Sequence, residues 1–168
     1  MTFAPEMMSM HKAFLLIGGN EGDRFAHLAR ARANIELICG QELDASSLYA
    51  TSAWGLREQP DFLNQVLLTG TEMKPEALLS AILGIETEMG RIRAARYGPR
   101  IIDIDILFFD QLLLDIPGLQ IPHPRIAERR FVLEPLAEIA PGLVHPVSHL
   151  SVAELLRRCT DPLEVKKI

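Results

Sequence analysis

The sequence has little of what marks secreted, membrane or disulfide-stabilised proteins. Its two cysteines, Cys39 and Cys159, are too few for a disulfide framework and too far apart for a paired zinc motif. The uncharged apolar runs are too short to span a bilayer. Residues 1–10 lack the basic start and apolar stretch of a signal peptide. These absences predict a protein of the reducing cytoplasm.

Basic residues are also scarce, since 17 Lys and Arg stand against 22 Asp and Glu and the net charge is −5. That balance argues against a general binder of nucleic acid or anionic membranes. The distribution is uneven, because seven of the 17 basic residues lie between positions 91 and 130 and all seven are arginine. An acidic protein with one arginine-rich stretch indicates a specific anionic ligand.

Apolar periodicity predicts an α+β fold, with a flexible tail at residues 1–12 and a single domain at residues 13–168. The predicted order, β-α-β-β-α-β, is the split βαβ arrangement of ferredoxin-like folds. We expect its helices on one face of the sheet and a C-terminal extension after residue 110. The expected strands are at 13–17, 46–51, 62–71 and 101–109, and the expected helices follow Asp23, start at Pro75 and span 152–158.

Asp103 and Asp105 are the sharpest candidate site. Residues two apart in a strand share a face, so both carboxylates point the same way, with Cα atoms roughly 6.5–7 Å apart. The opposite face would carry apolar residues toward the core: Ile102, Ile104, Ile106 and Phe108. Two adjacent carboxylates repel unless a cation joins them, and hard oxygen ligands suit Mg²⁺. A bare D-x-D motif is more often a pair of solvated acids on an edge strand, so context must decide.

The segment before this strand is a glycine-flanked loop with four arginines and no acid: Arg91, Arg93, Arg96 and Arg100. Arginine side chains bind phosphate oxygens in bidentate fashion. Alone, such a loop is an ordinary solvated basic segment. Beside a carboxylate pair it has what a metal–triphosphate site requires, because acids hold the cation and arginines hold the phosphates.

Weaker signals lie elsewhere. The Gly-Gly-Asn turn at 18–20 is neither a P-loop nor a dinucleotide fingerprint, and a tight turn is its plain interpretation. Asn64, close to Phe62 in a predicted strand, could match the hydrogen-bond donors and acceptors of a ring edge or be a surface amide. His123, between two prolines, could donate to a phosphate or be a loop residue. Trp54 belongs either to the core cover or to a pocket lid.

The run GPRIIDIDIL at 98–107 resembles the 6-hydroxymethyl-7,8-dihydropterin pyrophosphokinase family. The resemblance spans about residues 13–159 and includes IGGN at 17–20, QPDFLN at 59–64, RIR at 91–93 and IPHP at 121–124, with Arg129 and Phe131. It implies a ferredoxin-like enzyme of folate biosynthesis that transfers the pyrophosphoryl group of ATP to a reduced pterin, using two Mg²⁺ ions. We expect a cytoplasmic monomer whose partners are its small-molecule substrates, without nucleic acid or membrane.

By position, the resemblance implies three groups of site residues. The metal ligands are Asp103 and Asp105, and Asp105 is also the expected acceptor of the hydroxyl proton. The catalytic, phosphate-contacting arginines are Arg91, Arg93 and Arg100, and the ATP-binding residues are Glu86, Arg91, Arg100, His123 and Arg129. The pterin-binding residues are Thr51, Trp54, Phe62, Asn64, Tyr97 and Phe131.

The sequence departs from the family pattern at several positions. Tyr97 stands where Trp is common, Leu83 where a polar adenosine contact is common, and Arg130 where glycine is frequent, while Ser52 and Ala53 replace prolines. These changes bear on affinity and loop behaviour more than on the reaction. The alternative function is a ferredoxin-like module that binds RNA or a small ligand without catalysis. The acid pair and the net charge of −5 oppose RNA binding.

Overall fold

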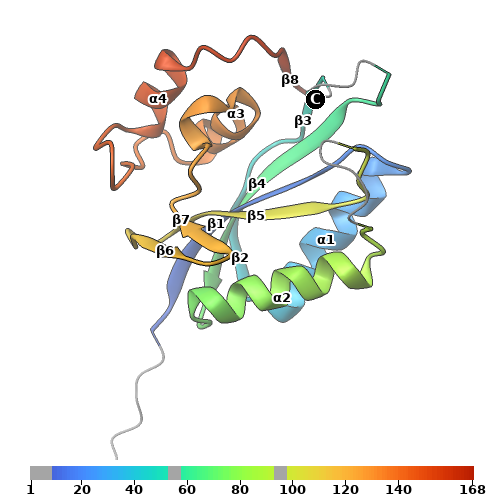
Figure 1. Ribbon diagram of the computed structural model, residues 1–168, viewed down its shortest axis with the longest axis horizontal. Helices are drawn as coiled ribbons and strands as arrows, with labels where there is room; N and C mark the ends of the chain where they lie inside the picture. Colours follow the sequence, from blue (N-terminus) through green and yellow to red (C-terminus); the bar gives the residue numbers. More distant parts are fainter. Residues whose placement is uncertain (1–8, 53–57, 93–97) are drawn as a thin grey trace, which may run out of the picture.

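The chain folds around an antiparallel sheet (Figure 1). A computed structural model describes residues 9–52, 58–92 and 98–168, and within them the sheet has six strands. The strand β1 (His11–Gly19) lies between β5 (Asp103–Phe109) and β4 (Phe62–Thr71), antiparallel to both. Beyond β4 lie β2 (Gln41–Ala45) and β3 (Tyr49–Thr51), and β8 (Val165–Lys167) pairs with β3.

The central strand β1 supplies apolar side chains to both faces of the sheet. Ala13, Leu15 and Ile17 are buried in one apolar cluster, and Phe14 and Leu16 in another. Successive side chains of a strand point to opposite faces, so a continuous apolar run is typical of a strand covered on both sides. The prediction of a buried strand over residues 13–17 is confirmed.

β1 begins earlier than the apolar run, within the segment expected as a tail. The Lys12 N–H donates to Asp110 Oδ1 at 2.8 Å, and His11 Nδ1 lies 2.7 Å from Asp110 Oδ2. Backbone pairing with β4 does not require apolar side chains, which is why polarity alone misplaced the start of the strand. Of the rest of the expected tail, residues 9–10 precede the strand without regular structure, and residues 1–8 lie outside the described residues.

Two helices, α1 (Arg24–Ile38) and α2 (Pro75–Glu88), cover one face of the sheet. Asp23 caps α1, because its carboxylate accepts from the Ala26 N–H at 3.1 Å. Proline occupies the first turn of α2, as the sequence predicts. Both helices bury residues at helical spacing against the sheet: Leu28, Ala31, Ile35, Leu78, Ile82 and Ile85.

Two further helices, α3 (Arg130–Ile139) and α4 (Val152–Arg158), cover the opposite face (Figure 1). The expectation of helices on one face therefore holds for α1 and α2 only. The sequence gives little sign of α3, because Pro135 inside it has no N–H for a helical hydrogen bond. Burial of apolar residues against the sheet compensates: Val132, Leu133 and Leu136. α4 has the predicted bounds.

The edge beside β4 differs from the predicted strand at 46–51. Only residues 49–51 of it form β3, and the polar segment before it forms β2. Ser46 separates the two strands, because its Oγ accepts the Val66 N–H at 3.0 Å where a backbone carbonyl would otherwise accept. The interruption follows from a local hydrogen bond that hydrophobic patterning does not encode.

The face of Phe108 was predicted wrongly. The register between β1 and β5 shifts by one residue, so that Leu15 lies opposite Ile106 while Phe14 lies opposite Phe108. This irregularity reverses the alternation, and Phe108 packs in the cluster beneath α3 and α4 rather than with Ile104.

The link from β5 to α3 contains the hairpin of β6 (Leu114–Ile116) and β7 (Leu119–Ile121), followed by the 3₁₀ turn η1 (Ile126–Glu128). Across the described parts of the chain, every helix is too short or too polar to cross a membrane.

Candidate active site

A pocket of about 470 Å³ lies on the face of the sheet that α3 covers. Its sheet wall comprises Leu16, Gly18, Thr51, Phe62, Asn64, Asp103 and Asp105. The segment entering α3 and its first turn contribute Arg125, Ala127, Glu128, Arg129 and Phe131. Ser52 and Arg100 add loop residues, and Arg158 with residues 160–163 contributes a wall after α4. The pocket therefore gathers residues from six separate stretches of the chain.

Gly18 lies in the middle of the sheet wall. It is paired with Asn64 on β4 and with Asp103 on β5, so an amide, a glycine and an acid form a row across three strands. A Cβ atom at position 18 would lie 2.2 Å from Asn64 Oδ1. At Gly19 a Cβ atom would lie 2.3 Å from the carbonyl oxygen of Ile101. Both glycines are therefore required by close approach rather than by a turn alone.

Asp103 and Asp105 point into this pocket from one face of β5, as predicted. Desolvation and, after it, the negative charge of Asp103 together raise the pKa of Asp105 to about 7. Among the residues that the structure describes, no hydrogen bond reaches the Asp105 carboxylate. A half-buried acid beside a second acid, with its oxygens facing a cavity, is chemically suited to a divalent cation.

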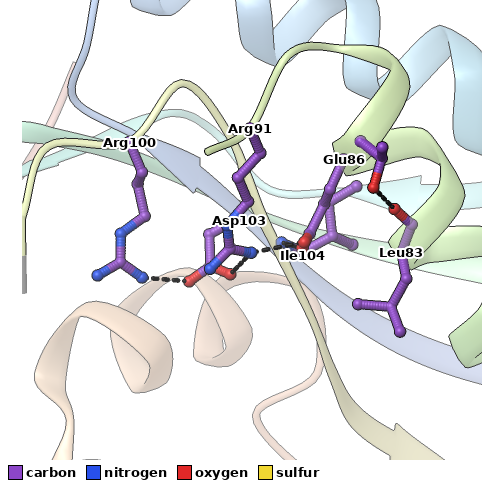
Figure 2. Close-up of polar contacts among 7 residues, drawn as sticks. Leu83, Glu86, Arg91, Arg100, Asp103 and Ile104 are labelled. Carbon is purple, nitrogen blue, oxygen red and sulfur yellow. Dashed lines mark hydrogen bonds and ion pairs between the residues drawn. The ribbon is translucent and has the colours of Figure 1, made fainter. Parts of the chain in front are cut away.

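Two arginines hold Asp103 (Figure 2). Arg100 Nη1 donates to Asp103 Oδ2 at 2.9 Å, and Arg91 Nη1 donates to Asp103 Oδ1 at 2.7 Å. Arg91 Nη1 also lies 2.5 Å from Glu86 Oε2, and Glu86 Oε1 accepts the Ile104 N–H at 2.8 Å. Burial raises the pKa of Glu86. Glu86 thus connects α2 to β5 and to the arginine that contacts Asp103.

Asn20, directly after the glycine pair, links the two loops that border the pocket. Its backbone N–H donates to the Arg100 carbonyl, and its Oδ1 accepts the Arg100 N–H, each at 3.0 Å. Its Nδ2 donates to Gln59 Oε1 at 3.0 Å and to the Pro60 carbonyl at 3.1 Å. The side chain is buried, so this turn has a structural role, in agreement with its plain interpretation from the sequence.

A polar and aromatic part of the pocket lies toward β3 and α3. Asn64 is only 5% exposed and lines the pocket. Thr51 Oγ1 is buried without a hydrogen-bond partner among the described residues. The rings of Phe62 and Phe131 both line the pocket. Buried polar groups without partners at a cavity are unfavourable unless a ligand satisfies them.

Two cations approach these rings. The guanidinium carbon of Arg100 lies 5.8 Å from the Phe62 ring centre, and that of Arg129 lies 5.6 Å from the Phe131 ring centre. Burial lowers the pKa of Arg129, and Asp105 opposes that change. A desolvated arginine near an acid pair is suited to an anionic ligand.

Several predicted site residues lie elsewhere. Glu86, Arg91 and His123 do not line the pocket, although the first two support Asp103. Burial, and then the charge of Arg129, lower the pKa of His123 to about 4, so its imidazole is neutral at pH 7. Its Nδ1 accepts the Arg125 N–H at 3.2 Å, which leaves Nε2 as the donor. Trp54, Arg93 and Tyr97 lie outside the described residues.

Sequence reasoning missed the wall after α4 as well as Leu16, Gly18 and Arg125. The C-terminal stretch 158–163 has no motif or periodicity, so no pattern could have indicated it. Gly18 was noted only as part of a turn. Its pairing with Asn64 and Asp103 depends on strand register, which a single sequence does not show.

An acid pair with flanking arginines, beside an amide and two aromatic rings, is typical of sites that hold a polyphosphate next to a flat heterocycle. A sequence model of the family described as 7,8-dihydro-6-hydroxymethylpterin-pyrophosphokinase (HPPK) matches residues 14–141. The chain therefore belongs to this family, and the resemblance seen in its motifs is confirmed.

Individual relatives agree. The chain is 40% identical over 160 residues to the 2-amino-4-hydroxy-6-hydroxymethyldihydropteridine pyrophosphokinase of Methylorubrum extorquens, with 95% of this chain and 99% of that protein covered. It is 42% identical over 145 residues to the folic acid synthesis protein fol1 of Schizosaccharomyces pombe, with 86% of this chain covered. The chain spans only 20% of the length of that fungal protein.

The fold is also similar to that of a solved structure, wild-type HPPK-DHPS of Plasmodium falciparum with pteroate. The TM-score is 0.73 at 16% sequence identity, with 89% of this chain and 42% of that chain covered. At this identity the likeness concerns the fold alone.

Proposed function

We propose that this chain transfers the pyrophosphoryl group of ATP to 6-hydroxymethyl-7,8-dihydropterin, with release of AMP, as a step of folate biosynthesis. The observation that carries the proposal is a single pocket in which Asp103, Asp105 and Arg100 lie beside Asn64 and Thr51. The charged residues are suited to a metal-bound triphosphate. The amide and hydroxyl are suited to the hydrogen-bonding edge of a pterin.

Asp103 and Asp105 are the proposed ligands of two Mg²⁺ ions. The residues fit, because Asp105 faces the pocket with no hydrogen bond from the described residues and with a raised pKa. Two carboxylates leave most of an octahedral shell to water and phosphate oxygens, which is the usual manner of binding Mg²⁺ with a nucleotide. When bound, Mg²⁺ neutralises phosphate charge and polarises the phosphoryl oxygens. Within the described ranges, no group of three His, Cys, Asp or Glu side chains forms a metal site made by protein alone.

The arginines are the proposed phosphate contacts. Arg100 is bonded to Asp103 in this structure, and we propose that it turns to the phosphates when ATP enters. Arg91 bonds to both Glu86 of α2 and Asp103 of β5, so we propose that it also holds Asp103 in place. Arg93, outside the described residues, is proposed as a further phosphate contact. His123 and Arg129 are proposed to contact ATP, and Glu86 to act there through Arg91.

The pterin is proposed to lie between the rings of Phe62 and Phe131, with its edge on Asn64 and Thr51. Trp54 and Tyr97, outside the described residues, are proposed as additional ring contacts. The hydroxymethyl oxygen then attacks the β-phosphorus, and the bond to the α-phosphate oxygen breaks as AMP leaves with that electron pair. Asp105 is the proposed acceptor of the hydroxyl proton, since its carboxylate faces the pocket. Arginine contacts that strengthen as charge moves toward AMP favour the transition state.

We also propose that the core is the ferredoxin-like split βαβ arrangement within one domain, expected over residues 13–168 and begun two residues earlier by β1 at His11. The order β5-β1-β4-β3, with all neighbours antiparallel, supports this assignment.

A cytoplasmic monomer is proposed for the same chain, and its two buried free thiols are consistent with a reducing compartment. The alternative of a non-catalytic binding module has no support from the site or from the family.

The test is direct. The protein is mixed with ATP, Mg²⁺ and 6-hydroxymethyl-7,8-dihydropterin, and the nucleotide products are separated by chromatography. AMP that forms only when the pterin is present, in equal amount to the pyrophosphorylated pterin, is the expected result. Formation of ADP, or AMP release independent of the pterin, would overturn the proposal.

A further inference from the structure

The C-terminal arm, defined here as residues 159–168, borders the pocket but has no part in the proposed reaction. Thr160, Asp161, Pro162 and Leu163 line the pocket. The arm then continues into β8, where Val165 is paired with Thr51 of β3. Figure 1 shows the arm running from α4 to the C-terminus beside β3.

Arg130 fixes the first half of the arm with three hydrogen bonds. Its backbone N–H donates to Asp161 Oδ2 at 3.0 Å, its Nε donates to the Asp161 carbonyl at 3.2 Å, and its Nη2 donates to the Cys159 carbonyl at 2.9 Å. Asp161 Oδ1 in turn accepts the Leu163 N–H at 3.0 Å. Arg130 is the first residue of α3, where an unpaired N–H and the helix dipole both favour a carboxylate.

The second half of the arm is held independently of Arg130. β8 pairs with β3, and the Ile168 N–H donates to the Leu48 carbonyl at 2.9 Å. Lys167 Nζ lies 3.6 Å from Glu138 Oε1 on α3. Removal of the Arg130 side chain therefore loosens residues 159–163 without detaching the end of the chain.

The position of the arm relates it to one substrate. In the sheet order β5-β1-β4-β3-β8, the arm adds its strand at the edge farthest from β5, which carries Asp103 and Asp105. Its first half is bonded to the residue beside Phe131, and its second half is paired with Thr51. The arm thus connects the two elements that are proposed to contact the pterin.

We propose that Arg130 is a positioning residue that holds residues 160–163 as a wall of the acceptor pocket, and that this wall increases affinity for the pterin but not for ATP. The proposal rests on the proposed function. Pro162 and Leu163 give the wall apolar surface, which excludes water from a bound ring. The Asp161 carboxylate also bonds to the backbone N–H of Arg130, which ties the wall to the turn that carries Phe131.

The test uses the full chain with Arg130→Ala, titrated by calorimetry with 6-hydroxymethylpterin and, separately, with Mg²⁺ and a non-hydrolysable ATP analogue. We expect the pterin Kd to rise about tenfold and the nucleotide Kd to change by less than about twofold. Hydrogen exchange should accelerate in residues 159–163 and remain unchanged in β8. In steady-state assays KM for the pterin should rise while kcat is kept. Arg157→Ala, which removes an exposed arginine of α4 outside the pocket lining, is the matched control and should change none of these quantities.

The outcomes separate the two proposals. If the wild-type protein binds no pterin, the proposed function fails, and this inference fails with it. If wild type binds the pterin and Arg130→Ala binds it equally well while residues 159–163 exchange faster, only the role of the arm is overturned. A selective loss of nucleotide affinity would overturn its assignment to the pterin. Asp161→Asn replaces one of the two oxygens that accept the Arg130 and Leu163 backbone N–H groups with an NH₂ group, which cannot accept. It should loosen the same segment and reproduce the Arg130→Ala pattern, including in the event that the latter variant folds poorly.

Discussion

Asp105 carries an energetic cost in the metal-free protein, and that cost predicts a pH dependence. Its carboxyl has an ordinary pKa of 3.8 and a pKa of about 7 in the folded chain. Between these values the unfolded chain loses a proton that the folded chain keeps, so stability falls as pH rises from about 4 to about 7. Asp105→Asn lacks this fall and should be more stable above pH 7 by on the order of a few kcal/mol.

Urea denaturation of both proteins across this pH range, without divalent metal, checks the prediction. The difference in stability between the two proteins isolates the Asp105 carboxyl, because the charges that act on it are the same in both. These charges are Asp103, Glu86, Arg129 and Arg91. Parallel stability curves for the two proteins would show that the folded pKa is not raised.

Removal of either acid should lower turnover, whereas removal of the Asp105 charge should raise stability. Asp103→Ala and Asp105→Ala should each lower kcat at least about a hundredfold, the loss typical of removing one group that organises transition-state charge. Asp115→Ala removes an exposed acid of β6 outside the pocket and serves as the control. Circular dichroism checks that the fold is retained. Activity within a few-fold of wild type in either site variant would contradict the metal assignment.

Asn64 should determine hydrogen bonding to the pterin, and Phe62 should determine stacking. Asn64→Leu keeps similar bulk but leaves a ligand edge unpaired, which should cost about 1–3 kcal/mol of pterin affinity. Phe62→Ala should cost a comparable amount through lost ring contact. Neither change should greatly alter binding of an ATP analogue, as measured by calorimetry. A loss of nucleotide affinity alone would mean that the two halves of the pocket are assigned in reverse.

At the scale of elements, strand β1 gives the site its width because it has no side chain at Gly18. In Gly18→Ala the new Cβ would meet Asn64 Oδ1 at 2.2 Å, so the amide must move. We expect pterin affinity to fall about as much as in Asn64→Leu, roughly 1–3 kcal/mol. Gly84→Ala in α2 is the matched control, since nothing lies within 4 Å of its added Cβ. That variant should bind normally and gain stability of up to about 1 kcal/mol. Equal pterin affinity in both variants would show that the absence of a side chain at Gly18 is not required for pterin binding.

The loop that precedes β5 provides the other element-scale test. Arg100 is paired with Asp103 before any nucleotide enters, so its phosphate contact requires a change of partner. A contact made late in the reaction lowers kcat when it is removed, with less effect on KM. Arg100→Ala should therefore show a large fall in kcat and a smaller change in KM for ATP in steady-state kinetics. A rise in KM with kcat preserved would make Arg100 a ground-state anchor.

At the scale of the whole molecule, the sequence predicts local structure better than it predicts what lies side by side. The buried strand at 13–17, the Asp23 cap and the Asp103/Asp105 pair follow from periods of two and 3.6 residues, and all three are present. α3 was missed because its packing overrides an internal proline. Asn64 and Asp103 lie on either side of Gly18 because strands far apart in the chain pair with β1. Only the motif resemblance indicated that they belong to one site.

Asn20 has a consequence for how the two proposed substrates influence each other. One buried amide bonds both to the backbone of Arg100, on the proposed nucleotide side, and to Gln59 and Pro60, just before the strand of Phe62 and Asn64. A ligand that shifts either loop must strain or relax the bonds of the other. We therefore expect binding of one proposed substrate to change the affinity for the other, and thermodynamic reciprocity requires the same factor whichever of them enters first.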